Sequence, residues 1–355
     1  MEIQRRTYLD CLRILATVGV ICVHASCHVI NSSVFPMPPI GSADWNIAAV
    51  YDAVVRFCVP IFVMISGSLF IERNFSIKKL FSKYIFRIIT AYFLWSLFYA
   101  LMAGNRSLYS ILTHTFSGGP RFAFLCYLVG LYLITPMLCQ IVSSKKVTLY
   151  YLALCFLFCF FEPQVAALLS GRGIPYISHL AELTDGIVQK MNIQFVMGMT
   201  GYYLLGYVLG HYEVKKSIRI VIYFLGIVGV ITTIVMTIFS SIRMGEADFS
   251  WYSYLSVNVL FESAAIFLLF KNVKMFEKLP NFWKLWIESI SRYTFGVYLL
   301  HSWVLDTLLP NVFGLSASGW PAIISVPTIT LLVFVISTII SGIIHQIPVL
   351  NRYVV

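Results

Sequence analysis

Long apolar stretches alternate with short polar ones along the whole chain. A helix needs about 20 apolar residues to cross a bilayer, and the chain has about ten stretches of roughly that length. This pattern predicts an all-α, polytopic membrane protein. The predicted spans are 9–30, 47–71, 84–103, 122–142, 147–169, 193–212, 218–240, 251–270, 286–308 and 321–344.

The composition agrees with this pattern. The 355 residues are 59% hydrophobic and only 11% charged, whereas a soluble domain carries about 25% charged residues. The net charge of +10 is compatible with a nucleic-acid partner or with membrane topology. Topology is the better explanation, because the cytoplasmic loops of membrane proteins collect Lys and Arg. No nucleic-acid partner is therefore expected.

The basic residues give the predicted orientation. With the N-terminus inside, sixteen of the 25 Lys and Arg residues face the cytoplasm, five face outward, and four lie in the membrane or at its edge. Both termini are therefore predicted to be cytoplasmic. The cytoplasmic set is Arg5, Arg6, Arg73, Lys78, Lys79, Lys83, Lys145, Lys146, Lys215, Lys216, Arg219, Lys271, Lys274, Lys278, Lys284 and Arg352; the outer set is Arg106, Arg121, Arg172, Lys190 and Arg243; the membrane set is Arg13, Arg56, Arg87 and Arg292.

The chain is expected to form one membrane domain over residues 1–355, because its loops are short. Arg5 and Arg6 precede the first span without a small-residue cleavage site, so no cleaved signal is expected. The eight cysteines lie in apolar stretches and form no Cys-x-x-Cys pair. This favours packing residues over disulfides or metal ligands. No metal site is expected, because the histidines lack Cys or carboxylate neighbours at ligand spacing.

The first span carries two ionisable residues on one face. Arg13 and His24 are eleven residues apart, close to three helical turns, so they share a face and are separated by a rise of about 16 Å. Ionisable residues inside a membrane helix are costly and usually mark a pathway or a site. This geometry suits a ligand that is held at the inner surface and reaches into the bilayer. His28 follows one turn after His24, near the outer interface, where solvent can also satisfy it.

Later spans place more polar residues near the depth of His24. The span 286–308 runs outward, as the first span does, and brings His301 to a similar depth. Asp52 and Arg56 fall in the outer half of the second span at i, i+4 spacing, so they can pair. The pair is either purely structural or part of a site with His24.

A basic cluster is predicted at the inner ends of four spans. Such a cluster can bind an anionic, phosphate-bearing ligand. For its lysines, the ordinary accumulation of charge in cytoplasmic loops is the alternative. Arg87 lies one turn inside its span, which favours a binding role, and Asp10 can hold Arg13 through an i, i+3 contact. The cluster comprises Arg13, Lys78, Lys79, Lys83, Arg87 and Arg292.

Four segments together resemble the acyltransferase-3 family of integral membrane O-acyltransferases. Leu9–Arg13 followed by His24 resembles the family's signature of an arginine and a histidine separated by ten residues. Three further motifs follow in the family's order, and the resemblance spans essentially the whole chain. They are RFCVPIFVMISG at 56–67, FLCYLVGLYLITP at 124–136 and SRYTFGVYLLH at 291–301.

Within the family the chain looks closest to the branch that lacks an appended extracytoplasmic domain and contains the O-acetyltransferase of enterobacterial common antigen. Two positions depart from the family pattern. Lys83 stands where many members have the first of two arginines, the second being matched by Arg87. The fourth-span motif begins with Arg121 and Phe122 in place of histidine and tryptophan.

The resemblance implies a multi-pass enzyme of the bacterial cytoplasmic (inner) membrane. It implies transfer of an acyl group from cytosolic acyl-CoA, with acetyl-CoA as the favoured cosubstrate, to a hydroxyl of a cell-envelope glycan or lipid-linked sugar. The CoA phosphates would bind the inner cluster. Arg13 and Arg87 are the expected main anchors, with Lys83 and Arg292 beside them.

His24 is the expected catalytic base, because a group that titrates near neutral pH suits deprotonation of a sugar hydroxyl. A covalent acyl-histidine is the alternative. Arg56, oriented by Asp52, is the candidate donor to the oxyanion of the tetrahedral intermediate. His301 either orients His24 or contacts the acceptor.

The competing functional class is a glycan or lipid-glycan exporter, or another secondary transporter. The polytopic fold and the membrane-embedded charges are compatible with it. Transporters built from inverted repeats often show two matching interrupted helices, and the sequence reveals no such pair. The alignment of Arg13 with His24 favours the acyltransferase.

Overall fold

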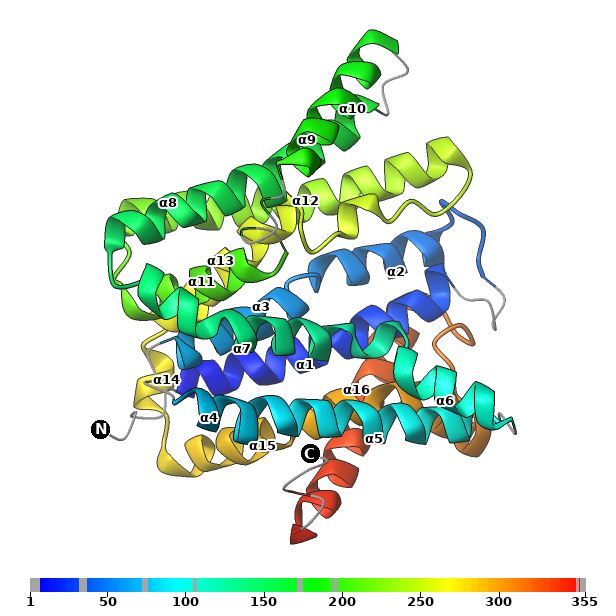
Figure 1. Cartoon of the computed structure of the whole chain (residues 1–355). Coiled ribbons are helices and arrows are strands. Elements are labelled where there is room, and N and C mark those ends of the chain that lie inside the picture. The colour runs from blue at the N-terminus through cyan, green and yellow to red at the C-terminus, as the bar shows by residue number, and fades with distance from the viewer. Residues whose placement is uncertain are drawn as a thin grey trace. The chain divides into compact units, whose positions relative to one another are not determined.

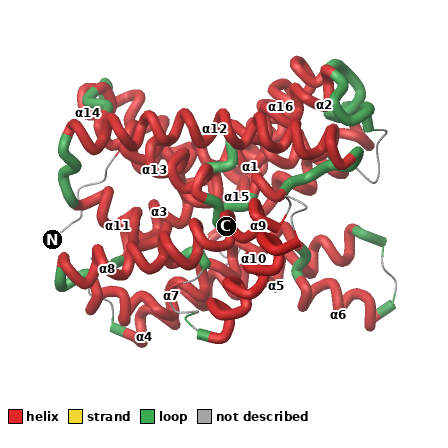
Figure 2. Tube along the Cα trace, turned by 90° about the horizontal axis from the view of Figure 1, so that it is seen from above, coloured by secondary structure: helices red, strands yellow, loops and turns green. Residues whose placement is uncertain are grey.

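The computed structural model describes residues 7–31, 37–71, 76–104, 107–170, 175–191, 193, 196, 198–348 and 351. Within these residues the chain is built of helices and loops, with no strand (Figure 1, Figure 2). Eight helical stretches are long and apolar enough to cross a membrane, which confirms an all-α polytopic membrane protein. They are Thr7–Ile30, Ala43–Phe70, Ile77–Met102, Ala123–Ile141, Lys145–Leu169, Lys216–Met244, Ser250–Asn272 and Ala322–His345.

Two of the ten predicted spans are not among these eight. The predicted span 193–212 contains α11 (Thr200–His211), which has only 12 residues. The predicted span 286–308 lies in α15 (Asn281–Trp303) and the π-helix η6 (Val304–Phe313) that continues it. The first half of α15 carries charged residues, which lower its mean hydropathy. That these two segments cross the membrane stays a prediction.

The chain forms two compact units, each assembled from separate segments. The first unit contains Met1–Cys58, Asn74–Ile134 and Val273–Val355. The second contains Val59–Arg73 and Thr135–Asn272. The chain therefore passes from one unit to the other repeatedly, and each unit joins residues that are far apart in sequence.

Helix α1 is the centre of the first unit. It packs against α2, α15 and α16, which lie beside it (Figure 1). Asp44 in the first turn of α2 accepts the Ala322 N–H at 2.8 Å, so the start of α16 is capped by a side chain of α2. The described elements of this unit are α1 (Thr7–Ile30), α2 (Ala43–Val54), α4 (Ile77–Lys79), η1 (Leu80–Ile85), α5 (Phe86–Met102), α6 (Leu108–Ser117), η2 (Pro120–Phe122), the first part of α7 (Ala123–Ile141), α14 (Met275–Lys278), α15, η6 and α16 (Ala322–His345).

The second predicted span is interrupted. Helix α2 ends at Val54, and α3 (Cys58–Phe70) begins after a turn that contains Arg56. Pro60 explains the turn, because proline has no N–H and its ring clashes with the carbonyl four residues earlier, that of Arg56. The apolar pattern of 47–71 does not reveal this break.

Helices α12 and α13 pack along each other in the second unit, and α11 contacts both α8 and α13. Two glycines allow α3 and α11 to approach closely: a Cβ atom on Gly206 would lie 2.1 Å from the Met64 carbonyl oxygen, and one on Gly67 would lie 1.8 Å from the Tyr203 carbonyl oxygen. The described elements are α3, the end of α7, α8 (Lys145–Cys155), η3 (Phe156–Phe161), α9 (Glu162–Ser170), α10 (Pro175–Lys190), α11, α12 (Lys216–Met244), η5 (Ser250–Tyr252) and α13 (Val257–Asn272).

Two segments between predicted spans, 104–121 and 170–192, contain the helices α6 (Leu108–Ser117) and α10 (Pro175–Lys190). Helix α6 packs on α5 and exposes large apolar side chains such as Tyr109, at 80%. This is typical of a helix at a membrane interface, whose apolar stretch is too short to resemble a full-length span. Six arginines used for the predicted orientation lie outside the described residues: Arg5, Arg6, Arg73, Arg106, Arg172 and Arg352.

Candidate active site

Helix α1 carries Arg13 near its predicted cytosolic end. Arg13 Nη1 donates to Asp10 Oδ1 at 3.3 Å, which confirms the predicted i, i+3 contact. The same oxygen of Asp10, a residue only 4% exposed, accepts a hydrogen bond from Ser291 Oγ of α15 at 2.6 Å. Asp10 therefore joins α1 to α15 and holds Arg13, whose side chain remains 31% exposed.

His24 and His301 meet in the first unit. Their ring centroids are 5.1 Å apart and their planes are inclined by 46°, which confirms that they lie at similar depth. His301 is only 2% exposed, whereas His24 keeps part of its surface accessible. Of the two rings, His24 is therefore the one that a substrate can reach more easily.

His301 is held by the end of its own helix. Its Nδ1 atom lies 2.5 Å from the Tyr298 carbonyl oxygen, and because a carbonyl can only accept, Nδ1 is the donor. In the neutral ring this leaves Nε2 as an acceptor, and Ser302 Oγ lies 3.3 Å from it. The hydrogen bonds thus assign the tautomer of His301.

Tyr99 of α5 inserts its hydroxyl into the backbone of α15 beside His301. The hydroxyl donates to the Leu299 carbonyl at 3.0 Å and accepts the Trp303 N–H, also at 3.0 Å. In an undisturbed α-helix that N–H would bond to that carbonyl directly. The insertion coincides with the change from α-helix to π-helix at Val304. An inserted side chain and a π-helical segment both mark a local departure from the regular ladder.

A polar cluster lies beside the histidine pair, on the side that is predicted to face outward. His28, one turn beyond His24 on α1, has Nε2 2.9 Å from Asp306 Oδ1. Arg121 donates to the other oxygen of Asp306 at 3.1 Å, and its guanidinium lies 5.2 Å from the ring centroid of Tyr99. Asp306 is 33% exposed and Arg121 is 46% exposed, so a ligand can reach both.

Asp52 and Arg56 form the predicted pair. Arg56 Nη2 donates to Asp52 Oδ2 at 2.5 Å, and the two side chains are 12% and 0% exposed. Cys27 Sγ lies 3.9 Å from the same oxygen. Because Cys27 follows His24 by about one turn of α1, the pair lies against α1 just outward of His24.

Arg87 and Arg292 lie at the predicted cytosolic end of the first unit. The Arg87 guanidinium lies 5.7 Å from the ring centroid of Phe295 on α15. The charges of both arginines act on the ring of His345 at the end of α16. Helices α5, α15 and α16 therefore bring these three residues into one region.

Arg292 and the three lysines of the inner cluster, Lys78, Lys79 and Lys83, are exposed. Arg292 bonds to Glu288 one turn earlier and is 59% exposed. Lys83 Nζ lies 5.8 Å from the ring of Tyr84. Arg13 lies near Arg292, because Asp10 bonds both to Arg13 and to Ser291, the residue directly before Arg292. Lys78 and Lys79 form the last turn of the short helix α4.

The sequence analysis did not identify Asp306 or Tyr99 as site residues. Asp306 carried a usable signal, because a carboxylate near the end of an apolar span often marks a site. Pro310 was a second signal, since a proline disturbs the carbonyl four residues earlier, here that of Asp306. Tyr99 gives no such signal, because it is one of 21 tyrosines and its role depends on a contact with residues 200 positions away.

Nothing in the described residues gathers three His, Cys, Asp or Glu side chains in a way that could hold a metal ion. The chemistry available in the first unit is that of its own side chains. An exposed basic end can bind phosphates, a partly accessible imidazole can move a proton, and an outer carboxylate and guanidinium can bind hydroxyls.

The acyltransferase domain family (Acyl_transf_3) matches residues 6–345. The match covers nearly the whole chain and includes both units. No curated protein and no solved structure matches the chain. The chain belongs to the acyltransferase-3 family, and together with its apolar helices this makes it a multi-pass membrane acyltransferase.

Proposed function

We propose that the protein is an O-acyltransferase of the bacterial inner membrane. It takes an acyl group, most simply acetyl, from cytosolic acyl-CoA and transfers it to a hydroxyl of a cell-envelope glycan or lipid-linked sugar. An acceptor related to that of the enterobacterial common antigen branch is the first to test, because the chain resembles that branch.

The donor end of the proposed site is the inner basic cluster. Arg13, Lys83, Arg87 and Arg292 supply the guanidinium and ammonium groups that bind phosphate oxygens. His24 lies about 16 Å further along α1 than Arg13. The extended arm of CoA therefore reaches from the phosphates toward the imidazole, which is the arrangement that a thioester substrate needs.

His24 acts as the base in the proposed reaction. It takes the proton of the acceptor hydroxyl while the hydroxyl oxygen attacks the thioester carbonyl carbon. The tetrahedral intermediate then collapses, the carbon–sulfur bond breaks, and the CoA thiolate receives the proton from His24. Arg56, held by Asp52, is our candidate donor to the oxyanion. His301 contacts the acceptor or fixes the His24 ring.

The acceptor end is the cluster of His28, Asp306 and Arg121. Its carboxylate accepts hydrogen bonds and its guanidinium donates them, which suits a ring with several hydroxyls. The charge of Arg121 is offset by that of Asp306 at 3.1 Å. This pairing favours a neutral sugar over a strongly anionic acceptor.

The observation that carries the proposal is the His24–His301 pair, 5.1 Å apart, between these two ends. The first test is transfer of radiolabel from acetyl-CoA into crude envelope glycan by the purified protein. Loss of the base in His24→Ala should lower transfer by at least about 100-fold. The variant should still insert into the membrane, as judged by its yield from membranes and its elution volume in size-exclusion chromatography.

His114→Ala is the matched control, because His114 is exposed on α6 and lies outside the site. It should transfer label as the unaltered protein does. Full activity of His24→Ala would show that His24 is not the base. Failure of the folded, unaltered protein to use any short acyl-CoA would favour the exporter instead.

A further inference from the structure

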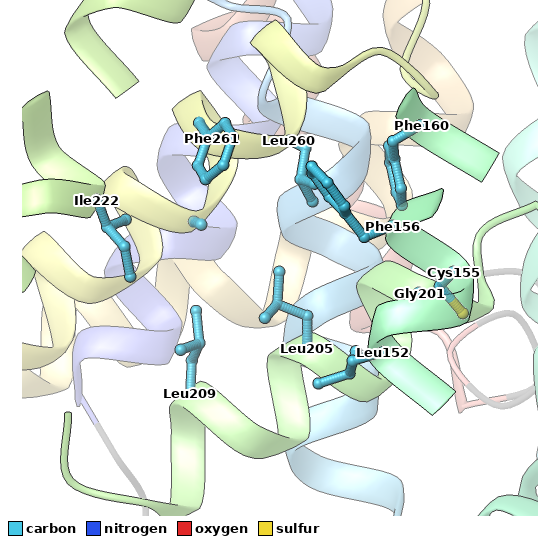
Figure 3. A pocket seen from close by; sticks show the side chains of 11 residues that line it. Leu152, Cys155, Phe156, Phe160, Gly201, Leu205, Leu209, Ile222, Leu260 and Phe261 are labelled. Carbon is cyan, nitrogen blue, oxygen red and sulfur yellow. The ribbon is translucent and has the colours of Figure 1, made fainter. Parts of the chain in front are cut away.

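An apolar cavity of about 180 Å³ lies within the second unit, among α8, η3, α11, α12 and α13. Leu205 and Leu209 of α11 point into it opposite Phe156, Leu260 and Phe261 (Figure 3). A cavity of about 150 Å³ with such a lining stays dry and binds small apolar molecules. This cavity therefore suits a segment of hydrocarbon rather than water or a polar ligand.

The cavity is part of the local architecture. Pro163 disturbs the carbonyl of Cys159 four residues earlier, and the chain is π-helical over Phe156–Phe161. Gly201 of α11 lies against the same segment, where a Cβ atom would lie 3.1 Å from the Phe160 ring and 3.2 Å from Cys155 Cβ. A π-helical segment and the close packing of Gly201 against it thus shape one wall of the cavity.

The cavity can be reached from the lipid. Phe156, at its edge, is 38% exposed, and Leu152 and Ile222 are partly exposed. Next to Ile222 on α12, Val221 and Phe224 are 54% and 64% exposed, as expected of a surface that faces acyl chains. A hydrocarbon chain can therefore enter sideways from the bilayer.

Basic residues lie at one end of the helices that line the cavity. Arg219 is one turn from Ile222 on α12, and Lys145 is two turns from Leu152 on α8, so each shares a helix face with a lining residue. Lys145 Nζ lies 5.9 Å from the Tyr212 ring. Arg219 bonds to Asn272.

Two further lysines add charge at this end. Lys216 is exposed at the start of α12. Lys271 Nζ donates to the carbonyls of Leu209 and Tyr212 at 2.8 and 2.9 Å. Glu213 lies 3.8 Å from Lys271 and is 88% exposed. With Lys145 and Arg219 these residues leave the end of the cavity predominantly positive.

We propose that the second unit binds an anionic phospholipid of the cytosolic leaflet. One acyl chain fills the cavity, and the phosphate lies among Lys145, Lys216 and Arg219. The alternative is that these charges only reflect the usual accumulation of basic residues in cytoplasmic loops. That alternative accounts for the charges, but it does not account for an apolar cavity that opens one or two helical turns from them. A chain in the cavity and a phosphate at its basic end are the two parts of one lipid.

The test is photolabelling of the full-length protein in phosphatidylcholine vesicles. The probe is a phosphatidylglycerol with a diazirine halfway along one acyl chain, and the same chain on phosphatidylcholine is the comparison. We expect the label on peptides that contain Cys155 and Phe261. The filling variants Ala264→Phe and Leu205→Trp, which place additional ring atoms in the cavity, should lower that label by about tenfold.

The charged end is tested separately. Lys145→Gln and Lys216→Gln should each lower labelling by the phosphatidylglycerol probe by about fivefold. Arg243→Gln, which removes a charge at the opposite end of α12, should leave it unchanged. Val228→Phe, which adds a ring on the exposed side of α12 instead of in the cavity, should also have no effect.

Labelling spread evenly over the lipid-facing helices would overturn the proposal, as would equal labelling by the two probes. Displacement of the probe by palmitoyl-CoA but not by unlabelled phosphatidylglycerol would assign the cavity to a fatty acyl-CoA instead. Elution volume and yield show which filling variant is folded. No acyl transfer is measured, so the result is independent of the proposed enzyme activity.

Discussion

Several charged residues of the first unit form ion pairs that join neighbouring turns or helices. Arg56 is paired with the buried Asp52, and Arg121 with Asp306. Removing one member of a buried pair leaves the other charge uncompensated, which is costly. Variants of Asp52 or Arg56 will therefore confound folding with catalysis, whereas exposed members of the inner cluster can be altered with less structural effect.

Arg87 is the best single position for testing the donor end. It is exposed and packs over Phe295. Loss of its charge-assisted bonds to a CoA phosphate in Arg87→Ala should raise the KM for acetyl-CoA by about tenfold and leave the KM for the acceptor nearly unchanged. Initial rates at varied concentrations of each substrate measure this. Lys146→Ala, an exposed lysine of the second unit, is the control, and an unchanged donor KM in Arg87→Ala would remove Arg87 from the donor site.

At the scale of single elements, the backbone at the end of α15 is shaped by a side chain of α5. The hydroxyl of Tyr99 takes the place of the backbone hydrogen bond that would close the turn containing His301. The position of that histidine therefore depends on α5 as well as on α15.

Tyr99→Phe removes the bridging hydroxyl and keeps the ring. The Leu299 carbonyl and the Trp303 N–H lose their partner, at a cost of about 1–3 kcal/mol, and the turn that carries His301 shifts. We expect kcat to fall by about tenfold with little change in the KM for acetyl-CoA. Tyr109→Phe, at an 80% exposed position, should behave as the unaltered protein. Equal losses in yield and activity would reduce the role of Tyr99 to stability.

The close contact between α3 and α11 depends on two glycines, Gly67 and Gly206, which have no side chain to hold the helices apart. In Gly206→Ala the new methyl group would meet the Met64 carbonyl oxygen at 2.1 Å, so the helices must separate. We expect a loss of stability of about 1–3 kcal/mol, seen as a lower melting temperature in detergent. Gly130→Ala on α7, where nothing lies within 4 Å of a new Cβ atom, should leave the melting temperature unchanged or raise it. A similar melting temperature for both variants would contradict the close approach.

The sequence predicts elements well where they depend on local pattern. The predicted spans 9–30 and 321–344 agree with α1 and α16 to within two residues at every end, because a continuous apolar stretch is a strong signal. The pairs Asp10–Arg13 and Asp52–Arg56 follow from helical spacing alone. The contacts of Asp306 with His28 and Arg121 join residues 278 and 185 positions apart, and no local pattern contains them.

At the scale of the whole molecule, the predicted site residues all belong to the first unit, and the apolar cavity belongs to the second. Because each unit is discontinuous in sequence, neither can be isolated by a simple truncation. Experiments on either one therefore require the full chain.

The orientation in the membrane can be tested with two serine-to-cysteine substitutions at exposed positions. Ser117 lies at the end of α6, predicted to be outside, and Ser144 precedes α8, predicted to be inside. In a background with the exposed Cys126 replaced by serine, a membrane-impermeant maleimide should label Ser117→Cys in intact cells and Ser144→Cys only after permeabilisation. The reverse pattern would invert the topology and place the basic cluster outside.

The continuity of helix α1 limits the sequence changes that this protein tolerates. One unbroken helix carries Arg13, His24 and His28. A single residue inserted between Arg13 and His24 would rotate His24 by about 100° relative to Arg13. Either His24 would then lose its contact with His301, or Asp10, which holds Arg13, would lose its contact with Ser291 of α15. Four inserted residues would nearly restore the angle but add about 6 Å to the separation. Single substitutions that keep the volume of a side chain change neither the angle nor the separation, so α1 can vary more in composition than in length.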